Sequence, residues 1–378
     1  MNTYQQTLYA DLMGLCQNSD AFYYVDQTLN DQMFRIFSYR LASYTEFQQR
    51  NAIECRGHSF RIDAAGNAIE LASLPMQKFW NDGENPNTMD LDYSKHNIDS
   101  IMDKLDGSLI STVKTLSGMR LKSKTSLNSV QAKDAWELLN TEDYTALRQY
   151  CATMASLGYT VNMEYCAPTN VIVIIHNEPS LRVLNVRRHS DGQYVSRKDI
   201  LKMVPMQFVV QALDIPDDSE QFVKSIADMT GIEGYIIVLK NGLFVKHKTV
   251  QYVNMHHIVS NLNSPKRLYE LIVTETTDDV IPLIKENTYL MNMLEVSTKN
   301  IRHVMVNMMN TVDTFYEQNK ALDRKSFAIL GLDQLSRHEF NLAMMKYVGK
   351  SIDYKEFMVK NYDLFKSYMS VSETVVEE

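Results

Sequence analysis

The sequence predicts an α+β fold in two parts, a mixed N-terminal domain of short strands and a few helices and an all-helical C-terminal domain. The first observation is the length of 378 residues, about twice that of a typical single domain. The second is a change of pattern near residue 255, where segments rich in β-branched and aromatic residues give way to helical periodicity. We therefore expect domains at residues 1–255 and 256–378.

Five segments of the N-terminal part are predicted to be strands, because they are rich in β-branched or aromatic residues. They are residues 159–165, 171–176, 181–188, 234–240 and 243–252. Turn signals separate them, and Asn241-Gly242 between two apolar runs predicts a hairpin, since both central positions of the favoured turn need positive φ.

The C-terminal part carries helix signals. Ser264-Pro265 is a fitting N-cap followed by proline in the first helical turn, and Ser336 with Glu339 forms a capping-box pattern. A buried helical face is predicted by apolar residues at i, i+3 and i+4 spacing. These are Ile301, Val304, Met305, Met308, Met309, Val312 and Phe315. Residues 371–378 are expected to form a frayed acidic tail.

Charge and cysteine usage exclude several classes of protein. With 38 Lys plus Arg against 46 Asp plus Glu the net charge is −8, so any phosphate-binding surface must be local. The four cysteines show no metal-ligand spacing, so neither a disulfide framework nor a structural zinc site is indicated. The sequence shows neither a signal-like N-terminus nor an apolar run of ~20 residues. We expect a soluble, cytoplasmic protein without membrane association or an obligate protein partner.

The string Lys104-Leu105-Asp106-Gly107-Ser108 lies between two short apolar runs. Its ordinary interpretation is a turn, because Asp-Gly between apolar runs is a common hairpin signal. A Lys-x-Asp-Gly string would occur by chance in about one chain in ten of this length. The functional interpretation is a lysine nucleophile beside a strand, which needs nearby positive charge, since an unperturbed lysine has a pKa of ~10.4.

A second pair of lysines, Lys246 and Lys248, alternates in Phe244-Val245-Lys246-His247-Lys248. In a strand both ammonium groups point to one face, where an anion such as the triphosphate of a nucleotide would relieve their repulsion. The alternative is an edge strand that lysines protect from aggregation.

Two carboxylates interrupt or adjoin apolar strand sequence, where an unpaired charge would be costly. Glu164 lies within Val161–Cys166 of the sequence, and Glu233 directly precedes the strand predicted at 234–240. A ribose hydroxyl or a hydrated metal could offset that cost. The alternative for each is an ordinary salt bridge or a solvent-facing position.

Taken in order, these pieces closely resemble the covalent nucleotidyltransferase superfamily of ATP-dependent ligases and capping enzymes. The matching motifs, from the nucleophile motif to the fifth, are Lys104-x-Asp106-Gly107, Glu164, Glu233-Gly234 and Lys246-x-Lys248. Finer strings resemble one branch, the bacteriophage RNA ligase 1 family that repairs cleaved tRNA. These strings are Arg35-Ile36-Phe37-Ser38-Tyr39, Glu54-Cys55-Arg56-Gly57, Pro75-Met76-Gln77-Lys78-Phe79, Lys122-Ser123-Lys124, and Glu164 with Ala167-Pro168-Thr169-Asn170.

The resemblance implies roles for residues outside the core motifs. Tyr39, Arg56 and Lys78 would contact the nucleotide, together with Lys104, Glu164, Glu233, Lys246 and Lys248. By the same resemblance, Lys122 and Lys124 would line the phosphate or RNA path, Tyr252 would serve sealing, and Asp278 would bind metal. One departure is Leu74, where the family pattern suggests a basic residue. Another is Leu184-Asn185-Val186-Arg187, which lacks the aromatic that many DNA ligases stack on adenine, so an aliphatic sandwich is expected.

The implied fold is an adenylyltransferase domain with antiparallel sheets flanked by helices at 1–255, followed by a helical domain at 256–378 that would recognise tRNA. The implied activity is ATP- and Mg²⁺-dependent joining of an RNA 3′-hydroxyl to a 5′-phosphate through AMP on Lys104, with cleaved tRNA as partner. Two alternatives stay open: a DNA ligase or capping-type nucleotidyltransferase, and a non-catalytic RNA-binding or virion-assembly protein on the same fold.

Overall fold

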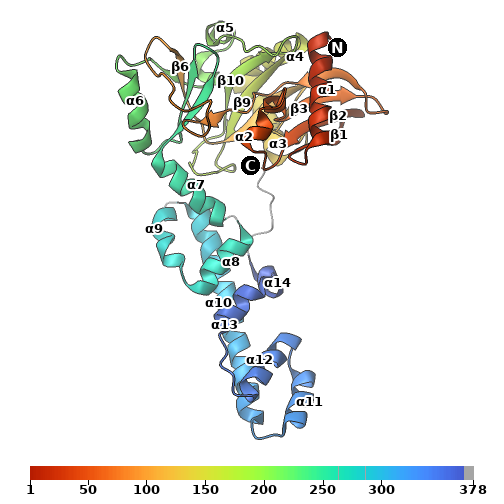
Figure 1. Ribbon diagram of the computed structural model, residues 1–378, viewed down its shortest axis with the longest axis vertical. Coiled ribbons are helices and arrows are strands. Elements are labelled where there is room, and N and C mark those ends of the chain that lie inside the picture. Colours follow the sequence, from red (N-terminus) through yellow and green to blue (C-terminus); the bar gives the residue numbers. More distant parts are fainter. Residues whose placement is uncertain (263, 286, 370–378) are drawn as a thin grey trace. The chain divides into compact units, whose positions relative to one another are not determined.

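The computed structural model describes residues 1–262, 264–285 and 287–369. The chain forms two compact units, Met1–Val253 and Asn254–Glu378, the first built from strands and helices and the second from helices (Figure 1). The α+β fold class predicted from the sequence is confirmed. The acidic tail expected at 371–378 lies outside the described residues.

Three sheets form the framework of the first unit. The first sheet has the strand order β1 (Phe22–Leu29), β2 (Gln32–Tyr39), β3 (His58–Ile62) and β4 (Ala68–Ser73). The second has the order β10 (Ser180–Arg188), β9 (Tyr159–Cys166), β7 (Ser108–Thr115) and β8 (Gly118–Lys122). The third has the order β11 (Ala212–Leu213), β6 (Ile98–Asp103), β12 (Gly234–Leu239), β13 (Phe244–Lys248) and β5 (Trp80–Asn81). All neighbouring strands run antiparallel except β13 and β5, which are parallel.

Helices flank these sheets (Figure 1). The α-helices of the first unit are α1 (Thr3–Asn18), α2 (Tyr44–Phe47), α3 (Val130–Leu139), α4 (Thr145–Ser156), α5 (Arg197–Leu201) and α6 (Ser219–Ser225). Short 3₁₀ turns are η1 (Ala52–Glu54), η2 (Glu142–Tyr144), η3 (Met206–Phe208) and η4 (Ile226–Asp228). α1 buries Leu8, Leu12 and Leu15 in the core of the first sheet, and α3 and α4 share a core with the second sheet. Burial of these apolar faces gives each sheet a rigid support for the residues at its edges.

The strand predictions are confirmed at three of the five segments, as β9, β10 and β12. The hairpin at Asn241-Gly242 is confirmed as the link between β12 and β13, although of its two central residues only Gly242 has positive φ, at 86°. The prediction for 171–176 is wrong, because the backbone N–H groups of Val173 and Ile174 donate to the carboxylate of Asp106 instead of to a neighbouring strand.

The prediction for 243–252 is wrong in its second half. β13 ends at Lys248, and α7 (Val250–Leu262) begins two residues later. The hydroxyl of Thr249 accepts a hydrogen bond from the backbone N–H of Tyr252 at 3.0 Å. A threonine that caps a first helical turn in this way favours helix over continued strand.

The second unit is helical. Beyond α7, its helices are α8 (Pro265–Thr274), η5 (Thr277–Asp279), α9 (Ile281–Ile284), α10 (Thr288–Asn319), α11 (Arg324–Gln334), α12 (Arg337–Tyr347), α13 (Tyr354–Lys360), α14 (Tyr362–Phe365) and η6 (Lys366–Tyr368). The predicted N-cap Ser264 and the capping box of Ser336 with Glu339 are confirmed. The predicted apolar face lies on α10, where Ile301 and Met308 are among the buried residues.

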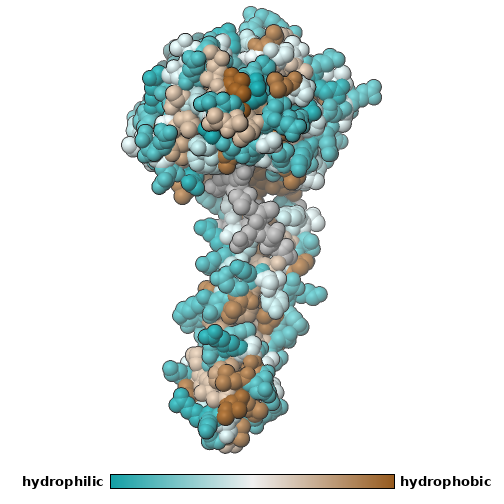
Figure 2. All heavy atoms as spheres, turned by 90° about the vertical axis from the view of Figure 1, so that its right-hand side faces the viewer, coloured by the Kyte–Doolittle hydropathy of each residue, from teal (hydrophilic) through white to brown (hydrophobic). Residues whose placement is uncertain are grey.

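Apolar residues of the helices pack inside the unit, as in α8 and α10. Among the residues described, no helix combines the length and the apolarity that crossing a membrane requires. Hydrophilic residues cover much of the face shown in Figure 2, with hydrophobic residues in small groups between them. Scattered apolar residues of this kind are usual on protein surfaces.

Candidate active site

Lys104 lies where the chain crosses from the third sheet to the second. It follows β6 and precedes β7, and its backbone N–H donates to the carbonyl of Gly234 at 3.0 Å, which fixes it against the start of β12. Its Nζ lies 2.6 Å from Oε1 of Glu233, and its side chain is 20% exposed. Lys104 is thus held on a rigid backbone while its amine stays accessible.

Glu233 connects two lysines of the site. Its side chain is 3% exposed, and its Oε1 also lies 3.1 Å from Nζ of Lys248. The following Gly234 has φ of 144°, and a Cβ there would collide with the carbonyl oxygen of His247. The Glu-Gly string is therefore required for β12 to approach β13 closely while the carboxylate points at the lysines.

Lys246 and Lys248 extend from the same face of β13, as their alternation predicted, while Val245 between them and His247 are buried on the other face. Burial lowers the pKa of Lys246 well below its usual value, and the charges of Lys78, Arg56, Lys104 and Lys248 lower it further. Within residues 1–262, 264–285 and 287–369, no carboxylate forms an ion pair with Lys246. A cation held this way is suited to bind an anion.

Glu164 lies on β9, opposite Leu109 of β7. Burial raises the pKa of its carboxyl group to about 8, and the negative charges of Glu233 and Asp106 also raise it, whereas Lys104 lowers it. These charges act on Glu164 only because they lie near it. The second and third sheets therefore bring the predicted carboxylates and Lys104 together. A carboxyl group in such surroundings is a candidate for a functional role.

We expect Glu164→Gln to change the pH dependence of stability. The pKa of Glu164 rises from 4.5 to about 8 on folding, so between these values the folded state binds the extra proton and stability falls as pH increases. Glutamine does not titrate, so its contribution to the free energy of unfolding does not change with pH. The melting temperature of the variant, measured without nucleotide, should exceed that of the wild type at about pH 8 by several degrees, and the gain should vanish near about pH 4.5. A gain that is the same at both pH values would contradict the assignment.

Asp106 supports the loop that carries Lys104. Its side chain is buried, and its carboxylate accepts hydrogen bonds from the hydroxyl of Tyr252 at 2.6 Å and from the backbone N–H groups of Val173 and Ile174 at 2.8 and 2.6 Å. Its backbone carbonyl oxygen lies 2.7 Å from Nε2 of His176. Two separate segments, residues 173–176 and the start of α7, are therefore attached to the residue two positions after Lys104.

The geometry also explains Gly107 and Tyr252. A Cβ on Gly107 would collide with the carbonyl oxygen of Tyr165 and lie 2.8 Å from Sγ of Cys166, so only glycine lets this turn pack against β9. Burial raises the pKa of the Tyr252 hydroxyl, and the carboxylates of Glu233 and Asp106 raise it further. The hydroxyl therefore keeps its proton and donates it to Asp106, while Lys248 lies 5.0 Å from the centre of the ring.

Aromatic rings surround the accessory lysines. Nζ of Lys78 lies 5.8 Å from the ring centre of Trp80 and 6.0 Å from that of Tyr39, and burial lowers its pKa. Nζ of Lys124 lies 5.4 Å from the same Tyr39 ring. The ring of Tyr39 thus lies close enough to two cations for cation–π attraction to each.

Lys122, which the sequence predicts to line the phosphate or RNA path, is enclosed by the protein. The side chain is fully buried. Its Nζ donates to the carbonyl oxygens of Gly57, Ser123 and Lys124 at 2.9, 2.8 and 3.0 Å. An ammonium group with three protein acceptors stabilises the backbone around Gly57, and contact of Lys122 with phosphate or RNA stays a prediction.

Asp278 belongs to the second unit, in η5, with an exposed side chain. Its metal-binding role stays a prediction. Among the residues that the structure describes, no group of three or more His, Cys, Asp or Glu side chains is arranged to hold a metal ion.

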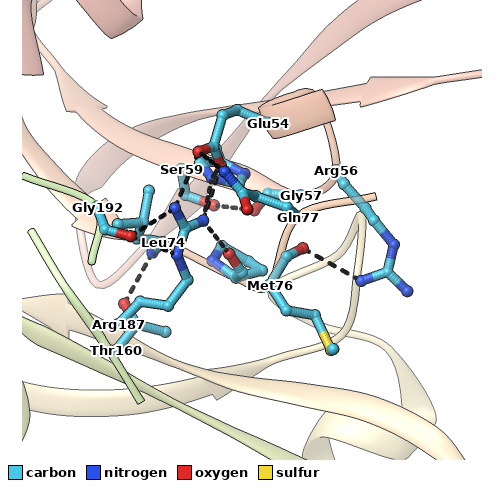
Figure 3. Close-up of polar contacts among 12 residues, drawn as sticks. Glu54, Arg56, Gly57, Ser59, Leu74, Met76, Gln77, Thr160, Arg187 and Gly192 are labelled. Atoms are coloured by element: carbon cyan, nitrogen blue, oxygen red, sulfur yellow. Dashed lines mark hydrogen bonds and ion pairs between the residues drawn. The ribbon is translucent and has the colours of Figure 1, made fainter. Parts of the chain in front are cut away.

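Sequence reasoning missed two residues that lie behind the site. Glu54 and Arg187 form a buried ion pair between η1 and β10, with Gln77 bonded to the same carboxylate (Figure 3). Glu54 appears in a string that carries the resemblance and Arg187 in a string that departs from it, each only as a neighbour of other residues. The available signal was an arginine near the end of an apolar strand, where a charge needs a partner.

Two family matches lie along the chain between residues 54 and 371. Residues 54–256 match the family described as RNA ligase, and residues 260–371 match the family described as T4 RNA ligase 1, C-terminal domain. Among solved structures, an archaeal ATP-dependent RNA ligase is 9% identical with a TM-score of 0.46, over 97% of this chain and 99% of that chain.

A mutant of the Naegleria gruberi RNA ligase with ATP and Mn is 12% identical with a TM-score of 0.39, over 62% of this chain and 77% of that chain. An apo mutant of the same ligase is 13% identical with a TM-score of 0.35, over 43% of this chain and 52% of that one. This chain thus spans about half the length of that relative.

The match over residues 54–256, which is more than half of the chain, places the protein in the family described as RNA ligase. Because both parts of the chain match, it belongs to the T4 RNA ligase 1 family.

Proposed function

We propose that this chain joins an RNA 3′-hydroxyl to an RNA 5′-phosphate in three transfers to phosphorus, with AMP held on Lys104 after the first. The observation that carries the proposal is the position of Lys104 Nζ, 2.6 Å from Glu233 and inside a group of cations that includes Lys246 and Lys248. Positioning and neutralisation of phosphate charge supply most of the rate in such transfers.

In the first step the unprotonated Nζ of Lys104 attacks the α-phosphorus of ATP, a nitrogen–phosphorus bond forms, and the bond to pyrophosphate breaks. Oε1 of Glu233 is placed to take up the proton of the amine. Lys246 and Lys248 hold the α-phosphate oxygens, and Arg56 and Lys78 add charge for the remaining phosphates. In the second step a 5′-phosphate oxygen of RNA displaces Lys104, and in the third a 3′-hydroxyl displaces AMP.

The residues of the site fit Mg²⁺ as the divalent ion. Mg²⁺ keeps several waters and binds through one or two carboxylates together with nucleotide phosphates, and Glu164 and Glu233 are the carboxylates that the two sheets bring together here. The ion would neutralise phosphate charge when bound. The same two carboxylates would also accept hydrogen bonds from the ribose hydroxyls.

We also propose that the natural substrate is a cleaved tRNA and that the helical unit recognises its folded shape. RNA helices are recognised mainly through shape and backbone contacts, which suits a separate surface. Residues 260–371, which match the T4 RNA ligase 1 C-terminal domain, form a compact unit of their own that could provide such a surface. Joining of a 5′-phosphorylated RNA compared with its DNA counterpart tests the choice of RNA over DNA.

Deletion of the chain after Asn263 should reduce sealing of a tRNA cleaved in its anticodon loop by about tenfold more than sealing of a generic single strand, equal to roughly 1.4 kcal/mol of lost recognition. The physical reason is that the single strand needs only the catalytic unit. The measurement is the rate of sealing of each of the two substrates. Adenylate formation by the deletion variant is the control for folding. Equal losses for the two RNAs would count against tRNA recognition by this unit.

A further inference from the structure

Three segments of the first unit that are far apart in sequence meet around one buried ion pair (Figure 3). Arg187, near the end of β10, is 1% exposed, and Glu54, the last residue of η1, is 4% exposed. Nη1 of Arg187 lies 2.7 Å from Oε2 of Glu54, and Nη2 lies 2.9 Å from Oε1. Two parallel hydrogen bonds of this kind fix the relative orientation of both groups.

The loop between β4 and β5 is attached to both members of the pair. Nη1 of Arg187 also donates to the carbonyl oxygen of Pro75 at 2.8 Å. Nε2 of Gln77 donates to Oε1 of Glu54 at 2.6 Å, and the backbone N–H of Gln77 donates to the hydroxyl of Tyr194 at 3.1 Å. Movement of either charged group would therefore move this loop.

The segment of Glu54 and the loop between β4 and β5 each carry a cation of the proposed phosphate site. Arg56 lies two residues after Glu54, and its Nη1 donates to the carbonyl oxygen of Met76 at 3.3 Å. Lys78 follows Gln77, and its backbone N–H donates to the carbonyl oxygen of Ile53 at 2.8 Å. Figure 3 shows Gln77 between Arg56 on the right and Arg187 on the left, with Glu54 above.

Arg187 has no donor left for a ligand. Its Nε and Nη2 donate to the carbonyl oxygen of Gly192 at 3.0 and 2.8 Å, so with the bonds to Glu54 and Pro75 all of its N–H groups have protein acceptors. Burial alone would raise the pKa of Glu54, but the charge and hydrogen bonds of Arg187 and the hydrogen bond from His58 outweigh it and lower that pKa. The carboxylate thus stays ionised and paired at neutral pH.

We propose that the Glu54–Arg187 pair is a positioning element for ATP binding: it holds Arg56 and Lys78 at the distance from Lys246 that the nucleotide phosphates require, without touching the nucleotide itself. The inference rests on the proposed function, because it assigns Arg56 and Lys78 to ATP. Loss of the pair would leave the fold intact in outline but allow the two cations to separate. ATP affinity, not only stability, should then fall.

The test uses Arg187→Lys, which keeps the buried positive charge but loses the planar fork and most of its donors. Binding of ATP with Mg²⁺ is measured by calorimetry on full-length protein carrying Lys104→Ala, so that no covalent adduct forms. We expect Arg187→Lys to raise the Kd for ATP about tenfold, a coupling typical of residues in one hydrogen-bonded network.

A double-mutant cycle separates positioning from a general structural role. In a background with Arg56→Ala and Lys78→Ala, Arg187→Lys should raise the Kd by no more than about twofold, because the cations through which it acts are gone. An equal rise in both backgrounds would overturn the proposal, as would an unchanged Kd in the first. If Arg187→Lys does not fold, Gln77→Met removes one bond to Glu54 without leaving a charge unpaired, and a smaller rise with the same dependence on background is expected.

Asp26→Asn provides the matched control. Asp26 forms a similar two-bond ion pair with the buried Arg35 in the first sheet, at 2.8 and 2.7 Å, but neither residue is bonded to the segments that carry Arg56 and Lys78. Its substitution should lower the melting temperature and leave the Kd for ATP unchanged. Protein that binds no ATP at all would overturn the proposed function as well, whereas ATP binding that ignores Arg187→Lys overturns the positioning role alone.

Discussion

Replacement of Lys104 by alanine is expected to abolish formation of the denaturation-resistant protein adduct with labelled ATP. In the proposed mechanism the amine of Lys104 is the group that bonds to phosphorus. Neither Glu233 nor Lys248, which lie beside it, would place a nitrogen nucleophile at the same point. Sealing with ATP should be lost with it. The amount of label that stays with the protein after denaturing electrophoresis is the measurement.

Two further variants make this test specific. Lys104→Arg keeps a positive charge near Glu233 but offers a guanidinium that is not a nucleophile at neutral pH, so it too should form no adduct. Lys114→Ala removes a lysine of β7 that is paired with Glu70, and it should keep the adduct. Label that persists on Lys104→Ala would remove this lysine from the mechanism.

Replacement of Lys246 by methionine should stabilise the protein without ligand while nearly abolishing adenylate formation. The pKa of Lys246 is well below its usual value because of burial and neighbouring cations, so at neutral pH its charge costs folding free energy, a cost that disappears only as pH rises toward the unfolded pKa. Methionine fills similar space without charge. The rate of adenylate formation should fall by about 10²- to 10³-fold, as for loss of one group that stabilises transition-state charge.

The measurement is a pair of thermal melts, with and without ATP and Mg²⁺. Wild-type protein should gain stability from the ligand, since binding to the folded state alone raises the melting temperature. The Lys246→Met variant should begin higher and gain less. Lys248→Met is the comparison, because Lys248 has Glu233 as a partner and its loss should not stabilise the protein. A destabilised Lys246→Met variant that still forms adenylate at the normal rate would contradict this account.

Local sequence patterns predicted the elements that depend on local forces. β-branched content indicated β9, β10 and β12, and caps such as Ser264 indicated helix starts. Alternation along β13 predicted that Lys246 and Lys248 share a face. The ordered motifs predicted the group of Lys104, Glu164 and Glu233, because each lies at a strand or strand end that the fold brings to one place.

Interactions between distant segments could not be predicted in this way. Residues 171–176 have the composition of a strand, but the buried carboxylate of Asp106 binds their N–H groups instead. Lysine is usually found on the surface, yet the ammonium group of Lys122 is buried and donates to three carbonyl oxygens, one of them that of Gly57. Glu54 and Arg187 are 133 residues apart in sequence, and no local pattern links them.

The most direct test of the account is the mass of the intact protein after incubation with ATP and Mg²⁺, followed by mapping of the modified peptide. The account predicts a gain of one adenylate, located on the peptide that contains Lys104, and its release when a 5′-phosphorylated RNA is added. An unchanged mass, or an adenylate located on another residue, would contradict it.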